Sequence, residues 1–387
     1  MGIRKSTLEG VARLRADFWK NKSVLITGHT GFKGAWLSLW LNSLGANVSG
    51  YATEPPTSPS LFELASVGIC TESTIADIRD SASLERVFKS NQPEIVFHMA
   101  AQSLVRPSYS NPVETFTTNV IGTVNVLESI RKCKSVKAVV IVTSDKCYEN
   151  RQWSRGYREN DPLGGYDPYS SSKACAELVT ASFRSSFFNR IDSQGNGVSI
   201  ASARAGNVIG GGDWAADRLI PDLVGAIIDD RSAVIRNPLA IRPWQHVLEP
   251  LSGYITLAES LCDSQSSTDQ AWNFGPDEAN VRSVNDVCNG MADRFEDAVH
   301  WRQDTSQNPH EAHSLILDSS KARRELGWKS ILTFEETLDW TAQWYKGYMA
   351  GKDGCESTLN DIDRYQSRLS KSSQETSICN VVHANKN

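Results

Sequence analysis

Short apolar runs alternate with amphipathic segments along the first half of the chain. Lys22–Thr27 (KSVLIT) is a β-branched apolar run that ends in a glycine cluster, which is typical of a buried parallel strand. Ala35–Leu44 carries apolar residues at helical spacing, Gly45 follows it, and Asn47–Tyr51 is a second strand-like run. The opening of the chain therefore predicts one βαβ unit.

The same alternation continues to about residue 205. Strands are predicted at Glu94–Met99, Ala138–Thr143 and Gly197–Ala203, and helices at Val113–Cys133 and Tyr169–Phe188. Strands that alternate with helices favour a parallel sheet covered on both faces. We therefore expect an α/β fold with a Rossmann-type, doubly wound parallel sheet.

The pattern loosens after Gly206, where loops rich in Gly, Pro, Trp and Asp separate short helices. The length of 387 residues is enough for two domains with additional ends. We expect a helical extension over residues 1–20 and a dinucleotide-binding domain that carries the catalytic residues over 21–205. A substrate-binding lobe over 206–355 would return some strands to the sheet, and residues 356–387 would form a polar, frayed tail.

Charge and cysteine content narrow the class of protein. Lys and Arg number 40 and Asp and Glu number 45, so the net charge of −5 disfavours a nucleic-acid binder. The eight cysteines form no C-x-x-C pair, which indicates reduced thiols and neither a zinc site nor a disulfide framework. No apolar run is long enough for a membrane span, and the scattered charges of the first residues lead us to expect no secretory signal. We expect a cytoplasmic protein without a metal, a membrane span or a nucleic-acid partner.

A glycine-rich loop lies between the first predicted strand and helix. Thr27–Gly34 reads TGHTGFKG, with glycines at 28, 31 and 34. Glycines at this spacing allow a tight turn and a close backbone approach to a pyrophosphate, and the helix N-terminus supplies unpaired N–H groups. The loop predicts a dinucleotide site, in which Lys33 either reaches the pyrophosphate or points to solvent.

The end of the second strand favours NAD over NADP. No arginine that could bind a 2′-phosphate follows Gly50 and Tyr51. An acid for the adenosine ribose is also missing at the expected place, with Glu54 one or two residues late. Asp77 is a candidate contact for the adenine amine.

Tyr169 and Lys173 form a Tyr-x-x-x-Lys pair at the start of a predicted helix. Their i,i+4 spacing places both side chains on one face. A lysine cation favours the phenolate form of tyrosine, which then serves as a base for a sugar hydroxyl. Ser144, at the end of the strand before this helix, is a candidate partner of the same hydroxyl.

The glycine loop, the HMAAQ strand end and the Tyr-x-x-x-Lys pair together resemble the extended short-chain dehydrogenase/reductase family over about residues 20–345. The resemblance implies bound NAD and a homo-oligomer, a dimer or tetramer, with the helix around Asn119 as a candidate interface. The implied cofactor contacts are Gly28, His29, Thr30, Gly31, Phe32, Lys33, Gly34, Asp77, Ile78, Ala100, Ala101, Gln102, Asn119, Tyr169 and Lys173.

Within that family, the run after the fifth apolar strand is similar to that of sugar-nucleotide 4,6-dehydratases. Asp145 matches the acid that protonates the leaving 6-hydroxyl, while Lys146 stands where most dehydratases have glutamate. The blocks TSDKCYEN, GYRENDPLGGYDPYS, ARAGNVIGGGDWA, RLIPD, RPWQHVLEPLSGY, WNFGP and PHEAH resemble the subgroup that acts on CDP-glucose.

This resemblance implies an NAD-dependent hydro-lyase that feeds deoxysugar biosynthesis for surface polysaccharide. The reaction is oxidation at carbon 4, elimination across carbons 5 and 6, and return of the hydride to carbon 6. Ser144, Asp145, Lys146, Tyr169 and Lys173 are the implied catalytic residues, and the base that acts on carbon 5 stays open because of Lys146.

The substrate contacts implied by the matching blocks are Ser144, Arg204, Asn207, Arg218, Arg242 and His310. An acidic protein needs such local cations to bind a nucleotide diphosphate. Two alternatives are a 4-epimerase, against which Asp145 argues, and a catalytically inactive dinucleotide sensor, against which the retained Tyr169 and Lys173 argue.

Overall fold

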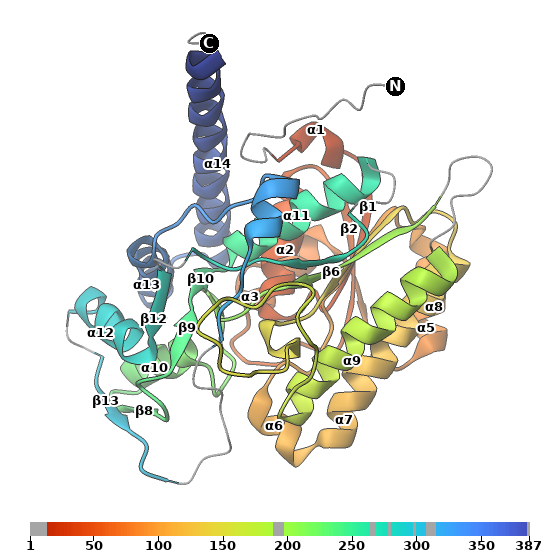
Figure 1. Ribbon diagram of the computed structural model, residues 1–387. Helices are drawn as coiled ribbons and strands as arrows, with labels where there is room; N and C mark the ends of the chain where they lie inside the picture. The colour runs from red at the N-terminus through yellow and green to blue at the C-terminus, as the bar shows by residue number, and fades with distance from the viewer. Residues whose placement is uncertain are drawn as a thin grey trace.

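The computed structural model describes residues 14–188, 197–263, 268–277, 280–296, 299–306 and 315–384, with side chains up to residue 371. The strands of its central sheet are β1 (Ser23–Thr27), β2 (Asn47–Ala52), β3 (Glu72–Ile75), β4 (Ile95–His98), β5 (Ala138–Val142), β6 (Ser199–Arg204) and β11 (Ala271–Asn273). All neighbours in this sheet are parallel, in the order β3–β2–β1–β4–β5–β6–β11 (Figure 1). The order reverses between β1 and β4, which places a ligand crevice at their carboxyl ends. The expected doubly wound α/β fold is confirmed.

Alternate residues of the inner strands β1, β4, β5 and β6 enter two separate hydrophobic cores. Val24 and Ile26 of β1 pack with the helices α2 (Phe32–Ser43) and α11 (Leu248–Asp263), whereas Leu25 packs on the opposite face. The helices on that opposite face are α5 (Ser81–Asn91), α8 (Gly122–Lys132) and α9 (Pro168–Phe183) (Figure 1). Strands that are buried on both faces explain the nearly continuous apolar runs of the sequence.

The helix predicted at Val113–Cys133 has a wider turn in its middle. It comprises α7 (Pro112–Phe116), a π-helical turn η1 (Thr117–Ile121) and α8. Asn119 lies in the wide turn and is buried. Such turns occur often at functional sites, because they redirect a single side chain without ending the helix.

The chain after residue 205 contributes to both the sheet layer and a smaller lobe. β11 joins the sheet beside β6, and α11 packs under β5 and β6. The lobe lies beside the sheet in Figure 1 and contains β7 (Val208–Ile209), α10 (Leu219–Ile228), β8 (Ala233–Ile235), β9 (Ile241–Pro243), β10 (Gln245–His246), β12 (Val281–Ser283), α12 (Val284–Arg294) and β13 (Trp301–Gln303). Its strands form the pairs β7–β10, β9–β12 and β8–β13.

The remaining elements are short turns and two C-terminal helices. The short elements are α1 (Ala16–Trp19), α3 (Leu61–Leu64), α4 (Val67–Cys70), α6 (Val105–Ser110), η2 (Asp145–Cys147), η3 (Arg184–Phe188) and η5 (Ala322–Leu326). α13 (Phe334–Met349) begins at a capping box of Thr333 and Glu336. Across the described parts of the chain, no helix has the length and apolar character needed to span a membrane.

The expected frayed tail is wrong, because residues 354–384 form the long helix α14 (Gly354–Ala384). Its first half packs on α2 and α13 and buries Ile362, Tyr365 and Leu369. These three residues follow helical spacing, and the polar residues between them hid that pattern. Figure 1 shows the far end of α14 standing away from the body of the protein.

Candidate active site

The glycine loop connects β1 to α2 at the switch point of the sheet. Gly28 has a φ of +81°, and a Cβ there would lie 2.7 Å from the Ala100 nitrogen. A Cβ at Gly34 would overlap the Gly28 carbonyl oxygen. Neither position accepts a side chain, so the backbone stays open above the N-terminus of α2. This cradle fits a dinucleotide pyrophosphate, which the free N–H groups of the first helical turn would hold.

His29 and Thr30 stabilise the loop with their side chains. The His29 ring is fully buried over Gly50 of β2, and its Nε2 lies 2.7 Å from the Ser73 hydroxyl. Burial lowers the pKa of His29 to about 4, so the ring is neutral. The Thr30 hydroxyl donates to the Thr53 carbonyl at 2.9 Å. Any contact of these two residues with a cofactor therefore comes from the backbone.

Phe32 and Lys33, in the first turn of α2, line a cavity rather than the outer surface. The Lys33 ammonium interacts electrostatically with Arg218, Lys173 and Asp145. Burial, with help from the two cations, lowers the pKa of Lys33 to about 8. The sequence left open whether Lys33 points to solvent or reaches the pyrophosphate. Its position in the cavity wall argues against solvent.

The other expected cofactor residues lie around the carboxyl ends of β3 and β4. The Ala100 nitrogen donates to the Thr27 hydroxyl at 3.2 Å, and Ala100 packs against Gly28. Asn119 Oδ1 accepts from the Gln102 nitrogen at 2.8 Å, while its Nδ2 donates to the Ser172 hydroxyl at 2.8 Å. Asn119 therefore joins the loop after β4 to α9. Ala101 lies in the same loop, between Ala100 and Gln102, whose backbone nitrogens are both hydrogen-bonded.

Asp77 and Ile78 follow β3 and have different surroundings. Asp77 forms an ion pair with Arg79 at the surface, and the Arg79 hydrogen bonds lower the pKa of the Asp77 carboxyl. Ile78 is buried and faces Gly122 of α8, where a Cβ would lie 2.7 Å from the isoleucine methyl carbon. A contact of Asp77 with adenine would compete with the Arg79 ion pair.

Tyr169 and Lys173 lie in the first turns of α9, where Asp167 caps the helix and Pro168 is its first residue. Both side chains are buried, at 7% exposure each. Lys173 Nζ donates to the Val142 carbonyl at 3.3 Å, so its ammonium lies at the end of β5. Burial lowers the pKa of Lys173 to about 8 and raises the pKa of Tyr169 to about 12. An interaction with Ser144 works against the increase at Tyr169.

Ser144, Asp145 and Lys146 follow β5 and begin the turn η2. The Ser144 hydroxyl donates to Asp145 Oδ1 at 2.9 Å and accepts from the Lys146 nitrogen at 3.2 Å. Asp145 is 2% exposed, and its Oδ2 has no hydrogen-bond partner among the described residues. All three residues line the cavity together with Tyr169. The cavity wall thus brings together a phenol, a hydroxyl, a carboxyl group and the amines of Lys146 and Lys33.

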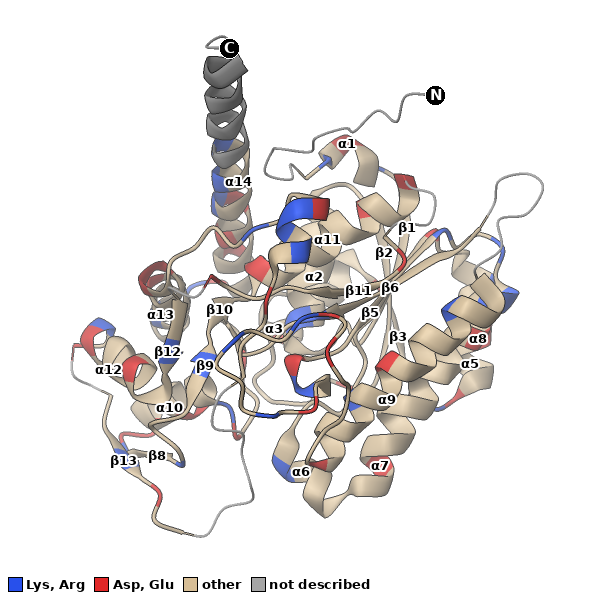
Figure 2. Ribbon diagram, viewed as in Figure 1, with Lys and Arg blue, Asp and Glu red and all other residues tan. Residues whose placement is uncertain are grey.

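The cavity has a volume of about 700 Å³ and lies between the sheet edge and the lobe. Asn207, Arg218 and Arg242 line it as expected, and so does Arg236, which the sequence analysis missed. Arg218 donates to Asp213 and to the Ser103 hydroxyl, at 2.9 Å each. Figure 2 shows basic residues on β9 and β12 of the lobe, although the chain is acidic overall. His310 lies outside the described residues.

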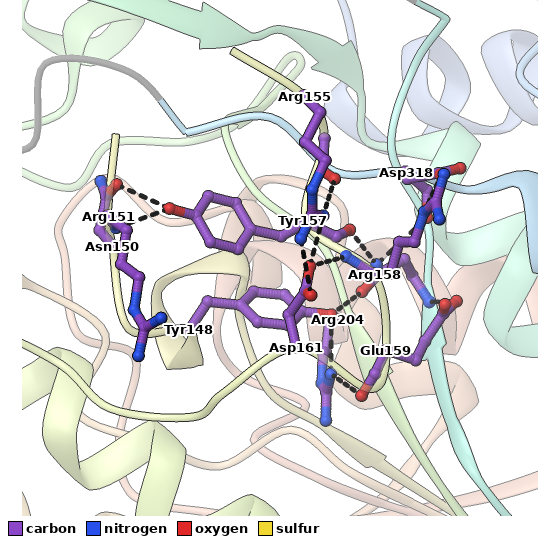
Figure 3. Close-up of polar contacts among 12 residues, drawn as sticks. Tyr148, Asn150, Arg151, Arg155, Tyr157, Arg158, Glu159, Asp161, Arg204 and Asp318 are labelled. Carbon is purple, nitrogen blue, oxygen red and sulfur yellow. Dashed lines mark hydrogen bonds and ion pairs between the residues drawn. The ribbon is translucent and has the colours of Figure 1, made fainter. Parts of the chain in front are cut away.

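Arg204 does not line the cavity, in contrast to the expected substrate contact. Its guanidinium is 3% exposed and pairs with Glu177 at 2.8 Å. It also donates to the Tyr148 hydroxyl at 2.7 Å and to the Glu159 carbonyl at 3.1 Å (Figure 3). The donors of Arg204 are thus used inside the protein, and we assign Arg204 a structural role.

Sequence reasoning also missed the residues that support the catalytic turn. Glu177, Gly206 and Gln245 are buried around the ends of β5 and β6, and none has a chemical type that signals its role. Asp213 and Arg236 were detectable in principle, since each is a charged residue in a loop that follows a short strand. No group of three metal-ligating side chains occurs in the described part of the chain.

Comparisons with known proteins agree with this geometry. The family model described as GDP-mannose 4,6 dehydratase matches residues 25–341. The chain is 51% identical over 355 residues to a CDP-glucose 4,6-dehydratase of Salmonella typhimurium strain LT2, covering 92% of this chain and 99% of that protein. It is 26% identical over 292 residues to a dTDP-glucose 4,6-dehydratase of Neisseria meningitidis, covering 70% and 77%.

Solved structures show the same fold. An epimerase of Methanothermobacter thermautotrophicus has a TM-score of 0.73 and 23% identity, covering 87% of this chain and 95% of its own. The dTDP-glucose 4,6-dehydratase of Bacillus anthracis, solved in complex with NAD, has a TM-score of 0.69 and 21% identity, covering 86% and 99%. Epimerases and dehydratases thus share the scaffold, and their different chemistry depends on the side chains of the site.

Proposed function

The chain belongs to the GDP-mannose 4,6 dehydratase family, and on this premise we propose that it is a CDP-glucose 4,6-dehydratase. It converts CDP-D-glucose to CDP-4-dehydro-6-deoxy-D-glucose and water. The observation that carries the proposal is that Ser144, Asp145 and Tyr169 line one cavity in a chain that is 51% identical to such an enzyme along most of its length.

The residues of the glycine loop fit NAD as the cofactor. The cradle at Gly28 and Gly34 would hold its pyrophosphate, and Ala100 would lie under the loop. NAD supplies a reversible oxidation. Carbon 4 of the sugar is a ketone during turnover, and the cofactor is oxidised again when the product leaves. Since the net reaction is loss of water, no further oxidant or reductant is required.

The chain's own residues move the protons. Tyr169 removes the proton of the 4-hydroxyl, and the Ser144 hydroxyl orients the same oxygen. The buried Lys173 ammonium favours the phenolate form of Tyr169. The ketone acidifies the hydrogen on carbon 5, and removal of this proton allows the 6-hydroxyl to leave. A proton returns to carbon 5 when the hydride is returned to carbon 6. Asp145, as the general acid, gives its proton to that hydroxyl, which departs as water.

Cationic residues of the lobe bind the diphosphate of the substrate. Arg218 and Arg242 line the cavity from the lobe, and Lys33 adds a third cation from α2. Guanidinium groups suit phosphate oxygens because they donate two parallel hydrogen bonds. These local charges let a chain of net charge −5 bind an anionic substrate.

The proposal is tested by incubating the purified protein with CDP-, UDP- and dTDP-glucose, with and without added NAD. We expect a product whose 4-keto group absorbs in alkali, formed fastest from CDP-glucose. An epimerised sugar without that absorbance would favour the 4-epimerase alternative. Binding of NAD without any conversion would favour a dinucleotide sensor.

We further propose that the enzyme forms a homodimer through α7, η1 and α9. α7 and η1 pack beside α9, and four apolar side chains of these elements and the adjoining η3 are at least half exposed: Val113, Ile121, Leu178 and Phe187. Apolar groups gathered in this way mark an association surface. Light scattering should give twice the chain mass for the wild type, and a monomer for Leu178→Glu. A monomeric wild type would contradict the proposal.

We place the enzyme in the cytoplasm, in the synthesis of deoxysugars for surface polysaccharide. Seven described cysteines are free thiols, which agrees with a reducing compartment. The product carries a 4-ketone, so the enzymes that consume it must be ones that act on a carbonyl or on its adjacent carbons. Fractionation of the producing cells, with the 4-keto sugar assayed in each fraction, checks this placement.

A further inference from the structure

Gly206 lies against the carboxyl group of Asp145. A Cβ at residue 206 would overlap Oδ2 and Cγ of Asp145 and would lie 2.7 Å from its Oδ1. All three distances are below 3.0 Å, the shortest separation that Cβ atoms show in proteins. Gly206 is not among the residues with positive φ. Its backbone conformation is therefore open to any residue, and the reason for a glycine is the space that Asp145 occupies.

The Gly206 backbone is held in place from behind. Gln245 Nε2 donates to the Gly206 carbonyl at 3.1 Å and to the Phe274 carbonyl at 2.9 Å. Gln245 itself is buried, and its β10 pairs with β7 just after Gly206. A larger residue at 206 therefore cannot be accommodated by a simple shift of the backbone, and the carboxyl group would have to move instead.

Asp145 cannot avoid such a residue by turning its carboxylate about the last side-chain bond. The overlap includes Cγ, which this rotation leaves in place. A change at the first side-chain bond would take the carboxyl group away from its hydrogen bond with Ser144. In the present position Oδ1 accepts from Ser144, and Oδ2 is the oxygen without a partner in the described structure.

We propose that Gly206, held by Gln245, is the positioning residue for the acid of the elimination step. It leaves room for the carboxyl group of Asp145, which stays hydrogen-bonded to Ser144 at the cavity wall, and thereby places this acid for protonation of the leaving 6-hydroxyl. This inference rests on the proposed function, since it assigns a role within the same reaction. Gly206, which has no reactive side chain, thus joins the residues that determine which reaction takes place.

The test uses the full-length enzyme and two substrates that differ in the leaving group. Fluoride at carbon 6 departs with far less need of an acid than hydroxide, so CDP-6-deoxy-6-fluoroglucose bypasses Asp145. For Gly206→Ala we expect kcat with CDP-glucose to fall by about 10²-fold, the usual contribution of a general acid. With the fluoro substrate, kcat should fall by less than about threefold, because the remaining steps do not use the acid.

Gly225→Ala, in α10 and outside the cavity lining, is the matched glycine control and should leave both rates unchanged. An equal loss with both leaving groups for Gly206→Ala would overturn the inference, since general damage does not discriminate between them. If the wild type fails to dehydrate CDP-glucose at all, the proposed function is refuted instead.

A second measurement covers the case in which Gly206→Ala does not fold. Asp145→Ala removes the overlapping carboxyl group, so Gly206→Ala added to it should fold with the same melting temperature as Asp145→Ala alone. A double variant that melts well below Asp145→Ala would show that the added methyl group collides elsewhere, and would overturn the inference. In the Asp145→Ala background, Gly206→Ala should also cause no further loss of kcat.

Discussion

Arg204 and Glu177 form a two-point ion pair inside the protein, with Nε–Oε1 of 2.9 Å and Nη2–Oε2 of 2.8 Å. The same carboxylate accepts hydrogen bonds from the Thr143 and Ser202 hydroxyls at 2.5 and 2.6 Å. Burial would raise the pKa of Glu177, but Arg204 and these donors lower it overall. One carboxylate of α9 thus ties the ends of β5 and β6 together, directly below the catalytic turn.

Removing either partner of this pair should destabilise the enzyme without a specific effect on substrate affinity. Arg204→Met leaves the Glu177 charge buried and unpaired, which costs about 3–5 kcal/mol. Urea unfolding should show this loss, while the KM of the remaining folded enzyme stays near the wild-type value. The double variant Arg204→Met, Glu177→Leu should recover part of the stability.

The exposed pair of Arg131 and Glu128 provides the control for this measurement. Arg131→Met should change the unfolding midpoint little, since exposed ion pairs contribute little to stability. A stable Arg204→Met enzyme with a raised KM would instead restore the substrate role expected from the sequence.

The pH profile should reveal how Lys173 assists Tyr169. Burial raises the pKa of the Tyr169 phenol to about 12. We expect the ammonium of Lys173, four residues later on α9, to favour the phenolate. In Lys173→Met the phenolate forms only at higher pH. The acidic limb of kcat/KM should therefore move to higher pH, with the greatest loss at neutral pH and partial recovery in alkali.

Lys173→Arg, which keeps the charge, is the matched variant and should show a smaller displacement of the limb. Tyr169→Phe should lose about 10²–10⁴-fold in kcat at every pH, as expected when a general base is removed. A loss in Lys173→Met that does not vary with pH would mean that the lysine acts only by holding the cofactor.

Lys146 is our candidate for the base that removes the hydrogen on carbon 5. It follows Asp145 directly and lines the cavity. Solvent deuterium should enter carbon 5 during turnover by the wild type, and Lys146→Ala should slow this entry by about 10²-fold or more. Lys146→Glu, which restores the residue of most dehydratases, should recover part of the exchange.

The exposed Lys89→Ala on α5 serves as the control and should exchange like the wild type. Undiminished exchange in Lys146→Ala would rule out the lysine as the base. The other amine of the cavity, Lys33, would then be examined by the same measurement.

Glu249 should make the stability of the protein depend on pH. Its carboxyl group is fully buried and accepts from the Tyr365 hydroxyl and from the Ile331 and Leu332 nitrogens. Burial raises its pKa from 4.5 to about 7. The folded state thus binds this proton more tightly than the unfolded state, so the contribution is complete below pH 4.5 and is lost as pH rises through about 7.

Glu249→Gln removes that dependence. At alkaline pH the variant should be more stable than the wild type, by an amount on the order of 3 kcal/mol, and its melting temperature should vary less with pH. Thermal melts across neutral pH measure both effects, with the exposed Glu356→Gln as the control. Parallel curves for Glu249→Gln and the wild type would show that Glu249 is already ionised in the folded protein.

The sequence predicted those parts of the site whose signals are local. The glycine loop and the Tyr169–Lys173 pair depend on residues a few positions apart, and the structure has them at the expected strand end and helix start. Arg204 could not be assigned in this way, because a guanidinium serves a phosphate or a carboxylate equally well. Its partner Glu177 lies 27 residues away in the chain and comes close only after folding.

Two further features depend on tertiary contacts for the same reason. Hydrogen bonds of Asn119 with Gln102 and Ser172, which belong to other segments, stabilise the wide turn. Helix propensity alone does not predict it. Gly206 resembles any loop glycine until the Asp145 carboxyl group is placed beside it.

The position of α14 affects when the helix under the cofactor cradle receives its last packing contacts during synthesis. Tyr365 packs edge-on against Trp40 of α2, at 5.6 Å between ring centroids, and its hydroxyl reaches Glu249 of α11. The helix that begins at the dinucleotide loop is thus covered by a segment that comes much later in the chain. The helix under the cofactor cradle therefore gains its full packing only after α14 has been synthesised.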